Sequence, residues 1–322
     1  MFETRMTRIL GIEYPIVGGT MMHLSTPEYV AAISEAGCLG LLASAMWKSK
    51  ASFREAIRRT RSLTDKPFGV NLNFFPAMRQ IDNNEYLDVI DEEGVPVVES
   101  SGHRAPEELI GRIKAKGRIW IHKCVGVRYA MKAESLGADI VTLVGYENGG
   151  ATGMLDIGTF VLIPRVVESV SIPVIGGGGV SNGKGLVAAL ALGAEGVIIG
   201  TRFLLTDECP IHDNLKQALL EAQETDTVLG LRTLGNTHRV WKNKAAEFVL
   251  ELEAQNAGLE AIIKAVAGEK DKLMYEQGDI QAGTISTGQG IGLCHDIKPM
   301  KILVQDIIQE AKQTAASIQK FI

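Results

Sequence analysis

Apolar residues along the chain fall into short, β-branched runs separated by longer stretches of helical character. Eight such runs are present, at residues 14–19, 38–44, 68–74, 96–102, 118–124, 138–145, 172–179 and 196–203. They are nearly continuous in apolar residues instead of alternating, which is typical of strands buried on both faces of a parallel sheet. Most runs are followed by a segment long enough for a helix, so the pattern predicts repeated β–α units.

Eight β–α units before residue 205 favour an α/β fold in which the strands close into a (β/α)₈ or TIM barrel. An open, doubly wound sheet is the alternative, although it does not normally need eight units. Helix signals support the alternation. Thr26 is a good N-cap residue and Pro27 suits a first helical position, and residues 53–62 form a second helical stretch.

The pattern changes after Phe203. Residues 213–275 are mostly helical and amphipathic in pattern, residues 281–294 form a glycine-rich loop, and residues 299–320 predict a final amphipathic helix. We therefore expect three parts: a barrel over residues 1–205, a helical subdomain over residues 206–295 that covers its mouth as a substrate lid, and a helix within residues 296–322 that completes the outer ring.

Composition narrows the class of protein. With 22% charged residues and a net charge of -5, the chain lacks the basic surplus of nucleic-acid-binding proteins. Its four cysteines show no metal-ligand spacing, so we expect reduced thiols and no metal site. There is no apolar run of signal-peptide or membrane-span length. These features predict a soluble, cytoplasmic protein without a membrane partner.

Two glycine-rich strand ends carry the strongest chemical signal. IGGGGV (175–180) ends the seventh run, and Gly200-Thr201 follows within the eighth. Barrels often bind phosphate at the loops after these two strands, and glycine lets backbone amides approach phosphate oxygens closely. Residues 181–184 begin a helix whose N-terminus adds positive charge. The candidate phosphate ligands are Gly177, Gly178, Gly179, Gly200 and Thr201; a glycine-rich turn without a ligand is the alternative.

The other strand ends supply the polar groups of a pocket on the same face. A flavin needs backbone donors and an amide at the polar edge of its ring, together with a cation that stabilises negative charge on the reduced ring. Lys123 is the candidate cation, and a salt-bridged structural lysine is the alternative. The further candidates are Gly19, Met21, Asn71, Asn148 and Gly150.

The chain resembles the nitronate monooxygenase family, also called 2-nitropropane dioxygenases, and within it the bacterial NADH:quinone reductases. The resemblance covers nearly the whole chain from about residue 8, and residues 172–212 carry its most specific motif. It implies a TIM barrel, FMN as cofactor, and FMN contacts at Gly19, Met21, Asn71, Lys123, Gly178, Gly179, Gly200 and Thr201. The motifs are PIVGGTM (15–21), EAGCLGLLAS (35–44), FGVNL (68–72), IHKC (121–124), IPVIGGGGVSNGKG (172–185) and NTHRVWKN (236–243).

One residue departs from the family pattern. The family loop after the sixth strand resembles E-x-G-G-H-x-G, with a catalytic histidine, whereas this chain has Ala151 at that position. Alanine cannot transfer a proton, and a general base contributes about 10²–10⁴ in rate. We therefore expect impaired proton abstraction from neutral nitroalkanes. A preformed nitronate has already lost that proton, so its oxidation stays open.

Other residues are candidates to replace the missing histidine. In addition to Lys123, the candidate catalytic residues are His103, which follows the fourth run, and His23, which follows the first. A structural or solvated histidine is the simpler interpretation of each. Ala151, Tyr146 and Asn148 are the candidate residues of the substrate pocket.

The leading functional hypothesis is an FMN-dependent oxidoreductase that uses NAD(P)H to reduce a quinone or an activated alkene. Hydride transfer needs stacking and orientation more than a protein base, so the loss of the histidine harms it least. Three alternatives remain open: nitronate oxidation with O₂, enoyl-thioester reduction, and a non-catalytic flavin-binding barrel. We expect a small-molecule substrate and consider a homodimer as the candidate assembly.

Overall fold

The computed structural model describes residues 2–75, 82–102, 104–266 and 269–321. Its centre is an eight-stranded parallel sheet in the order β1-β9-β8-β6-β5-β4-β3-β2. A parallel bridge between Val17 and Leu39 joins the first strand to the second and closes the barrel. Each predicted run contains one strand, so the TIM barrel is confirmed. The strands are β1 (Ile16–Gly18), β2 (Gly40–Ala43), β3 (Phe68–Asn73), β4 (Val97–Ser101), β5 (Ile119–Cys124), β6 (Ile140–Val144), β8 (Val174–Gly177) and β9 (Gly196–Ile199).

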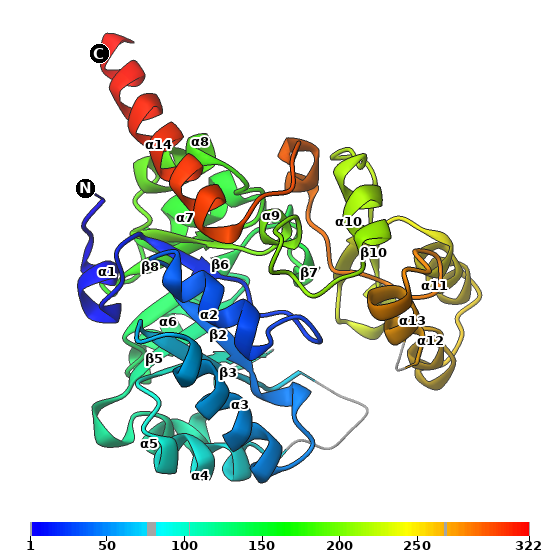
Figure 1. Ribbon diagram of the computed structural model, residues 1–322, viewed down its shortest axis with the longest axis horizontal. Helices are drawn as coiled ribbons and strands as arrows, with labels where there is room; N and C mark the ends of the chain where they lie inside the picture. Colours follow the sequence, from blue (N-terminus) through cyan, green and yellow to red (C-terminus); the bar gives the residue numbers. More distant parts are fainter. Residues whose placement is uncertain (1, 76–81, 103, 267–268, 322) are drawn as a thin grey trace.

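Helices surround this sheet (Figure 1). The start signal at residue 26 is confirmed, because the Thr26 side chain accepts a hydrogen bond from the Tyr29 amide and Pro27 opens the helix. The helices up to the last barrel strand and just beyond it are α1 (Arg5–Leu10), α2 (Pro27–Glu35), α3 (Lys50–Leu63), α4 (Asn83–Glu93), α5 (Ile110–Ile113), α6 (Val127–Ser135), α7 (Thr159–Val167), α8 (Gly183–Ala191) and α9 (Thr201–Leu204).

Apolar residues fill both faces of the strands, as their continuous pattern predicts. Inside the barrel, Val17, Leu41, Ile121 and Ile175 belong to one buried cluster. Larger clusters occupy the layer between strands and helices, where Trp120 and Phe203 are fully buried. The interior is therefore a packed core, and only the strand ends are left to build a site.

After the barrel strands the chain forms helices α10 (Asp213–Leu220), α11 (Lys244–Ala254), α12 (Leu259–Val266), α13 (Glu269–Gln277) and α14 (Met300–Ile318). Figure 1 shows α11, α12 and α13 away from the barrel, whereas α14 packs against α8 and α2. Within the described ranges, no helix is both long and apolar enough to cross a membrane.

The prediction of a mostly helical region after the barrel misses a small antiparallel sheet. Its strands β10 (Thr227–Gly230) and β11 (His238–Trp241) pair with each other, and β11 also pairs with β7 (Gly150–Ala151) from the loop after β6. Strands of two to four residues are too short to show a reliable alternation of polar and apolar positions. This sheet ties the region after the barrel to the barrel mouth.

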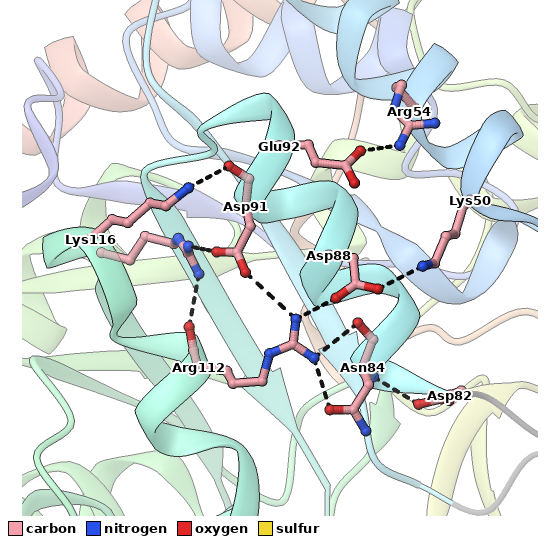
Figure 2. A network of polar contacts seen from close by, with 10 residues as sticks. Lys50, Arg54, Asp82, Asn84, Asp88, Asp91, Glu92, Arg112 and Lys116 are labelled. Atoms are coloured by element: carbon pink, nitrogen blue, oxygen red, sulfur yellow. Dashed lines mark hydrogen bonds and ion pairs between the residues drawn. The ribbon is translucent and has the colours of Figure 1, made fainter.

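Charged side chains link the outer helices (Figure 2). Asp88 on α4 accepts hydrogen bonds from Lys50 Nζ of α3 and from an Arg112 guanidinium nitrogen of α5, each at 2.6 Å. These partners hold the pKa of Asp88 below its usual range. Because the groups are solvent-exposed, water and salt screen the pairs, and they orient the helices more than they stabilise the fold.

Stability should depend on pH through a buried histidine. His122, 1% exposed on β5, lies with Nδ1 2.9 Å from Ser100 Oγ, and burial lowers its pKa from 6.5 to about 4. Below pH 6.5 the unfolded chain binds a proton that the folded chain does not, so this contribution is complete above pH 6.5 and falls as the pH drops toward 4. The expected loss is about 3 kcal/mol.

Denaturant unfolding at pH 7.5 and pH 4.5 measures this loss. The variant His122→Gln removes the titrating group, so its free energy of unfolding should fall about 2.5 kcal/mol less between the two pH values than that of the wild type. Equal pH dependence in both proteins would show that another group causes the effect.

Candidate active site

The carboxyl ends of the barrel strands enclose a cavity of about 680 Å³. This volume is within the usual range for small-molecule and cofactor sites, about 300–1,000 Å³. Most of the candidate residues line it together although they come from six different strand ends: Gly19, Met21, His23, Asn71, Lys123, Asn148, Gly150, Ala151, Gly178, Gly179, Gly200 and Thr201.

Two of the described candidates do not line the cavity. Gly177 is buried within β8, where a Cβ atom would collide with Ile198. The Tyr146 ring packs under the Arg239 guanidinium, 4.6 Å from its centroid, and is not among the described residues that line the cavity. His103 lies outside the described residues. Gly177 and Tyr146 therefore have packing roles in this structure.

The loops after β8 and β9 form a cradle of backbone donors. Gly178 and Gly179 have φ values of +98° and +74°, which favour glycine. Among the described residues, the amides of Gly179, Gly200 and Thr201 donate no hydrogen bond to protein. A Cβ atom at Gly200 would meet nothing within 4 Å. Open space and unused N–H groups fit a phosphate.

The helix predicted after the glycine run contributes less than expected. It begins as α8 at Gly183, with Asn182 as its N-cap accepting from the Gly185 amide at 2.9 Å. The Gly183 amide, however, donates to Glu310 Oε2 on α14 at 2.7 Å. Because these two amides of the first turn already have protein partners, a phosphate bound here would depend on the loop amides.

A buried carboxylate lies beneath the cavity. Glu99 on β4 is completely buried, and its Oε2 atom accepts from Asn71 Nδ2 at 2.5 Å, from Thr20 Oγ1 at 3.1 Å and from Lys123 Nζ at 3.3 Å. Its Oε1 atom has no partner among the described residues. Lys123 is thus salt-bridged and also part of the cavity wall, and its role toward a flavin ring stays a prediction. Sequence reasoning missed Glu99, although a charge inside a buried strand is a signal.

The loop after β6 is rigidly held. The Glu147 carboxylate accepts hydrogen bonds from the Thr159 amide at 2.9 Å and the Thr159 hydroxyl at 2.8 Å. The Glu147 carbonyl accepts from the Gln289 amide at 2.9 Å. Residues 235–238 and 284–286 form another wall of the cavity next to this loop. These residues fall within the region expected to cover the barrel mouth, but none of them was named as a site candidate, although NTHRVWKN stands out as a motif.

Sequence comparison assigns the family. Residues 3–310 match the family model of nitronate monooxygenase. A (3aS,4S,5R,7aS)-5-hydroxy-7a-methyl-1-oxo-octahydro-1H-indene-4-carboxyl-CoA dehydrogenase from Rhodococcus jostii is 34% identical, over 96% of both chains. A probable nitronate monooxygenase from Staphylococcus aureus is 29% identical, over 97% of this chain and 98% of its own.

The chain also matches solved structures over nearly its whole length. FabK from Thermotoga maritima matches with a TM-score of 0.90 and 36% identity, over 99% of both chains. A nitroalkane oxidase from Streptomyces ansochromogenes matches with a TM-score of 0.84 and 26% identity, over 98% of this chain and 100% of that one. The chain therefore belongs to the nitronate monooxygenase family of flavin-dependent oxidoreductases and is an enzyme.

Proposed function

We propose that the protein is an FMN-dependent oxidoreductase that uses NAD(P)H to reduce an activated alkene or a quinone. The observation that carries the proposal is a single cavity that holds both the phosphate cradle and the Lys123–Glu99 pair. When bound, FMN would supply the hydride-transfer chemistry that links a nicotinamide to the acceptor. One terminal phosphate fits the cradle, and the described residues form no separate Rossmann unit for the adenosine half of FAD.

In this proposal the residues of the chain bind the cofactor and orient it toward the acceptor. The amides of Gly179, Gly200 and Thr201 hold the phosphate, and the Lys123 ammonium stabilises negative charge on the ring. Glu99 keeps that ammonium in place through its 3.3 Å contact with Nζ. Ala151 leaves space in the cavity for an acceptor. None of these roles needs a protein base, because hydride transfer depends on orientation.

Side chains at the cavity wall favour an acceptor with a carbon skeleton. Met22, Tyr129, Met154 and Leu155 line the cavity yet are 41–54% exposed. Tyr275 and Ser286 also line it, which supports the expectation that residues 206–295 cover the substrate side. Since the Rhodococcus relative is named a carboxyl-CoA dehydrogenase, an alkene conjugated to a thioester is the first acceptor to test.

Steady-state assays with three acceptors test the proposal. We expect NAD(P)H consumption with crotonyl-CoA or a soluble quinone to be at least tenfold faster than oxidation of ethylnitronate by O₂. The second candidate function, nitronate oxidation, is favoured by the family model and by the S. aureus relative. Nitronate-driven oxygen uptake that exceeds every NAD(P)H-dependent rate would support it instead.

A further inference from the structure

A histidine lies directly across the β-ladder from Ala151. In the antiparallel pair β7–β11, Ala151 is the register partner of His238, and both residues line the cavity. Opposite residues of an antiparallel pair project to the same face, with Cβ atoms about 4.5–5.5 Å apart. The His238 imidazole therefore lies next to the position that the side chain of residue 151 occupies.

The surroundings of His238 determine which ring nitrogen can exchange a proton with a ligand. Its Nδ1 atom is 3.1 Å from the carbonyl oxygen of Asn236. Because a carbonyl only accepts, Nδ1 carries a proton, and Nε2 is the accepting atom of the neutral ring. Thr237 O accepts from the Thr152 amide at 3.1 Å, which fixes the strand that carries the histidine against the loop.

We propose that His238 is a catalytic residue that exchanges a proton with a substrate carbon, in place of the histidine that Ala151 replaces. The proposal rests on the proposed function. When an activated alkene is reduced, one carbon receives the hydride that originates from NAD(P)H. In the imidazolium form Nε2 also carries a proton. The C=C electron pair takes that proton at the adjacent carbon, which leaves the ring neutral, and the ring then regains a proton at Nε2 from solvent. In reverse, Nε2 accepts a proton from a carbon next to an electron-withdrawing group.

The other titratable groups that line the cavity also have protein partners or lie farther from residue 151 along the chain's elements, and none of them is a register partner of Ala151. Lys123 is paired with Glu99, and the Glu147 carboxylate binds Thr159. Burial raises the pKa of Cys124 to about 12. The neighbouring cation on β11, Arg239, donates to the Tyr146 carbonyl.

Three further titratable groups line the cavity. The Tyr275 hydroxyl donates to Thr284 O at 3.0 Å, and Tyr129 lies on α6. His23, the other histidine among the described lining residues, is on the loop after β1 with its ring 5.9 Å from that of Tyr275. The β-ladder therefore selects His238, and His23 is the comparison.

Proton exchange without NAD(P)H tests this role separately from hydride transfer. The FMN-loaded protein is incubated anaerobically with nitroethane in D₂O, and loss of the α-proton signal is followed by NMR. We expect His238→Ala to slow exchange about 10²–10⁴-fold and to slow it more than His23→Ala does, whereas His295→Ala, outside the cavity lining, stays within threefold of wild type. Moving the histidine across the ladder, in Ala151→His/His238→Ala, should recover at least tenfold of the loss.

A second readout separates a catalytic from a structural role. The rate of flavin bleaching by NADH should change less than threefold in His238→Ala, because that step needs no protein proton donor. Exchange in the wild type no faster than in His238→Ala, equal loss of exchange and bleaching, or loss in His23→Ala instead would each overturn the proposal. A wild-type flavin that NAD(P)H does not reduce contradicts the proposed function alone, since exchange is measured without a nicotinamide.

Discussion

Replacing Gly200 with aspartate is expected to weaken FMN binding at least 100-fold while the barrel stays folded. A Cβ atom at this position meets no protein atom within 4 Å, and its backbone, with φ -109°, is accessible to other residues. The new carboxylate enters the cavity where we place the phosphate dianion. Two charges about 4 Å apart near a protein surface repel by about 4 kcal/mol, enough for this loss. Flavin fluorescence titration of the protein after flavin removal measures it.

A matched neutral variant separates charge from bulk. Gly200→Asn adds a side chain of nearly the same size without the charge and should lose less than tenfold in FMN affinity. Riboflavin lacks the phosphate, so its affinity should differ little between the aspartate and asparagine variants. Similar losses of FMN affinity in both variants would place the phosphate away from this loop.

Lys123→Met is expected to lower the free energy of unfolding by about 3 kcal/mol and to weaken flavin retention. The substitution leaves the Glu99 carboxylate, 0% exposed, without its cation. Breaking a buried ion pair by removing one partner costs about 3–5 kcal/mol, and the lower end applies because the Lys123 side chain is 19% exposed. The loss of the cation should also make the reduction potential of the bound flavin more negative.

The double variant Lys123→Met/Glu99→Gln separates the two effects. It removes both charges, so most of the stability should return in denaturant unfolding, whereas flavin retention and potential should stay altered. Recovery of both properties would mean that Lys123 serves the fold alone. Unchanged stability in Lys123→Met would contradict the buried ion pair.

The barrel could be predicted because each of its strands carries a local signal. Strands buried on both faces leave continuous apolar runs such as Ile140–Val144, and the parallel order follows from the helices between them. The open loop after β8 was predictable for a similar reason, since Gly178 and Gly179 mark a backbone path that other residues disfavour. Both signals lie within a few neighbouring residues.

Features that depend on distant pairing could not be predicted in this way. The His238 side chain acquires its place only because β11 pairs with the two residues of β7, far away in the sequence. The short strands β10 and β11 were not predicted because they lie between segments with a helical pattern and are defined only by their pairing. In the sequence, Glu99 is an isolated charge within a strand. Its partners Asn71, Thr20 and Lys123 come from other parts of the chain and meet it only in the folded structure.

Anaerobic mixing of the purified protein with NADH and NADPH tests the central claim most directly. The flavin is first extracted and identified by mass, and its absorbance near 450 nm is then followed after mixing. We predict FMN and its complete bleaching by at least one of the two nicotinamides, with the colour restored when crotonyl-CoA or a quinone is added. Co-purification of FAD alone, or FMN that neither nicotinamide bleaches while ethylnitronate does, would contradict the claim.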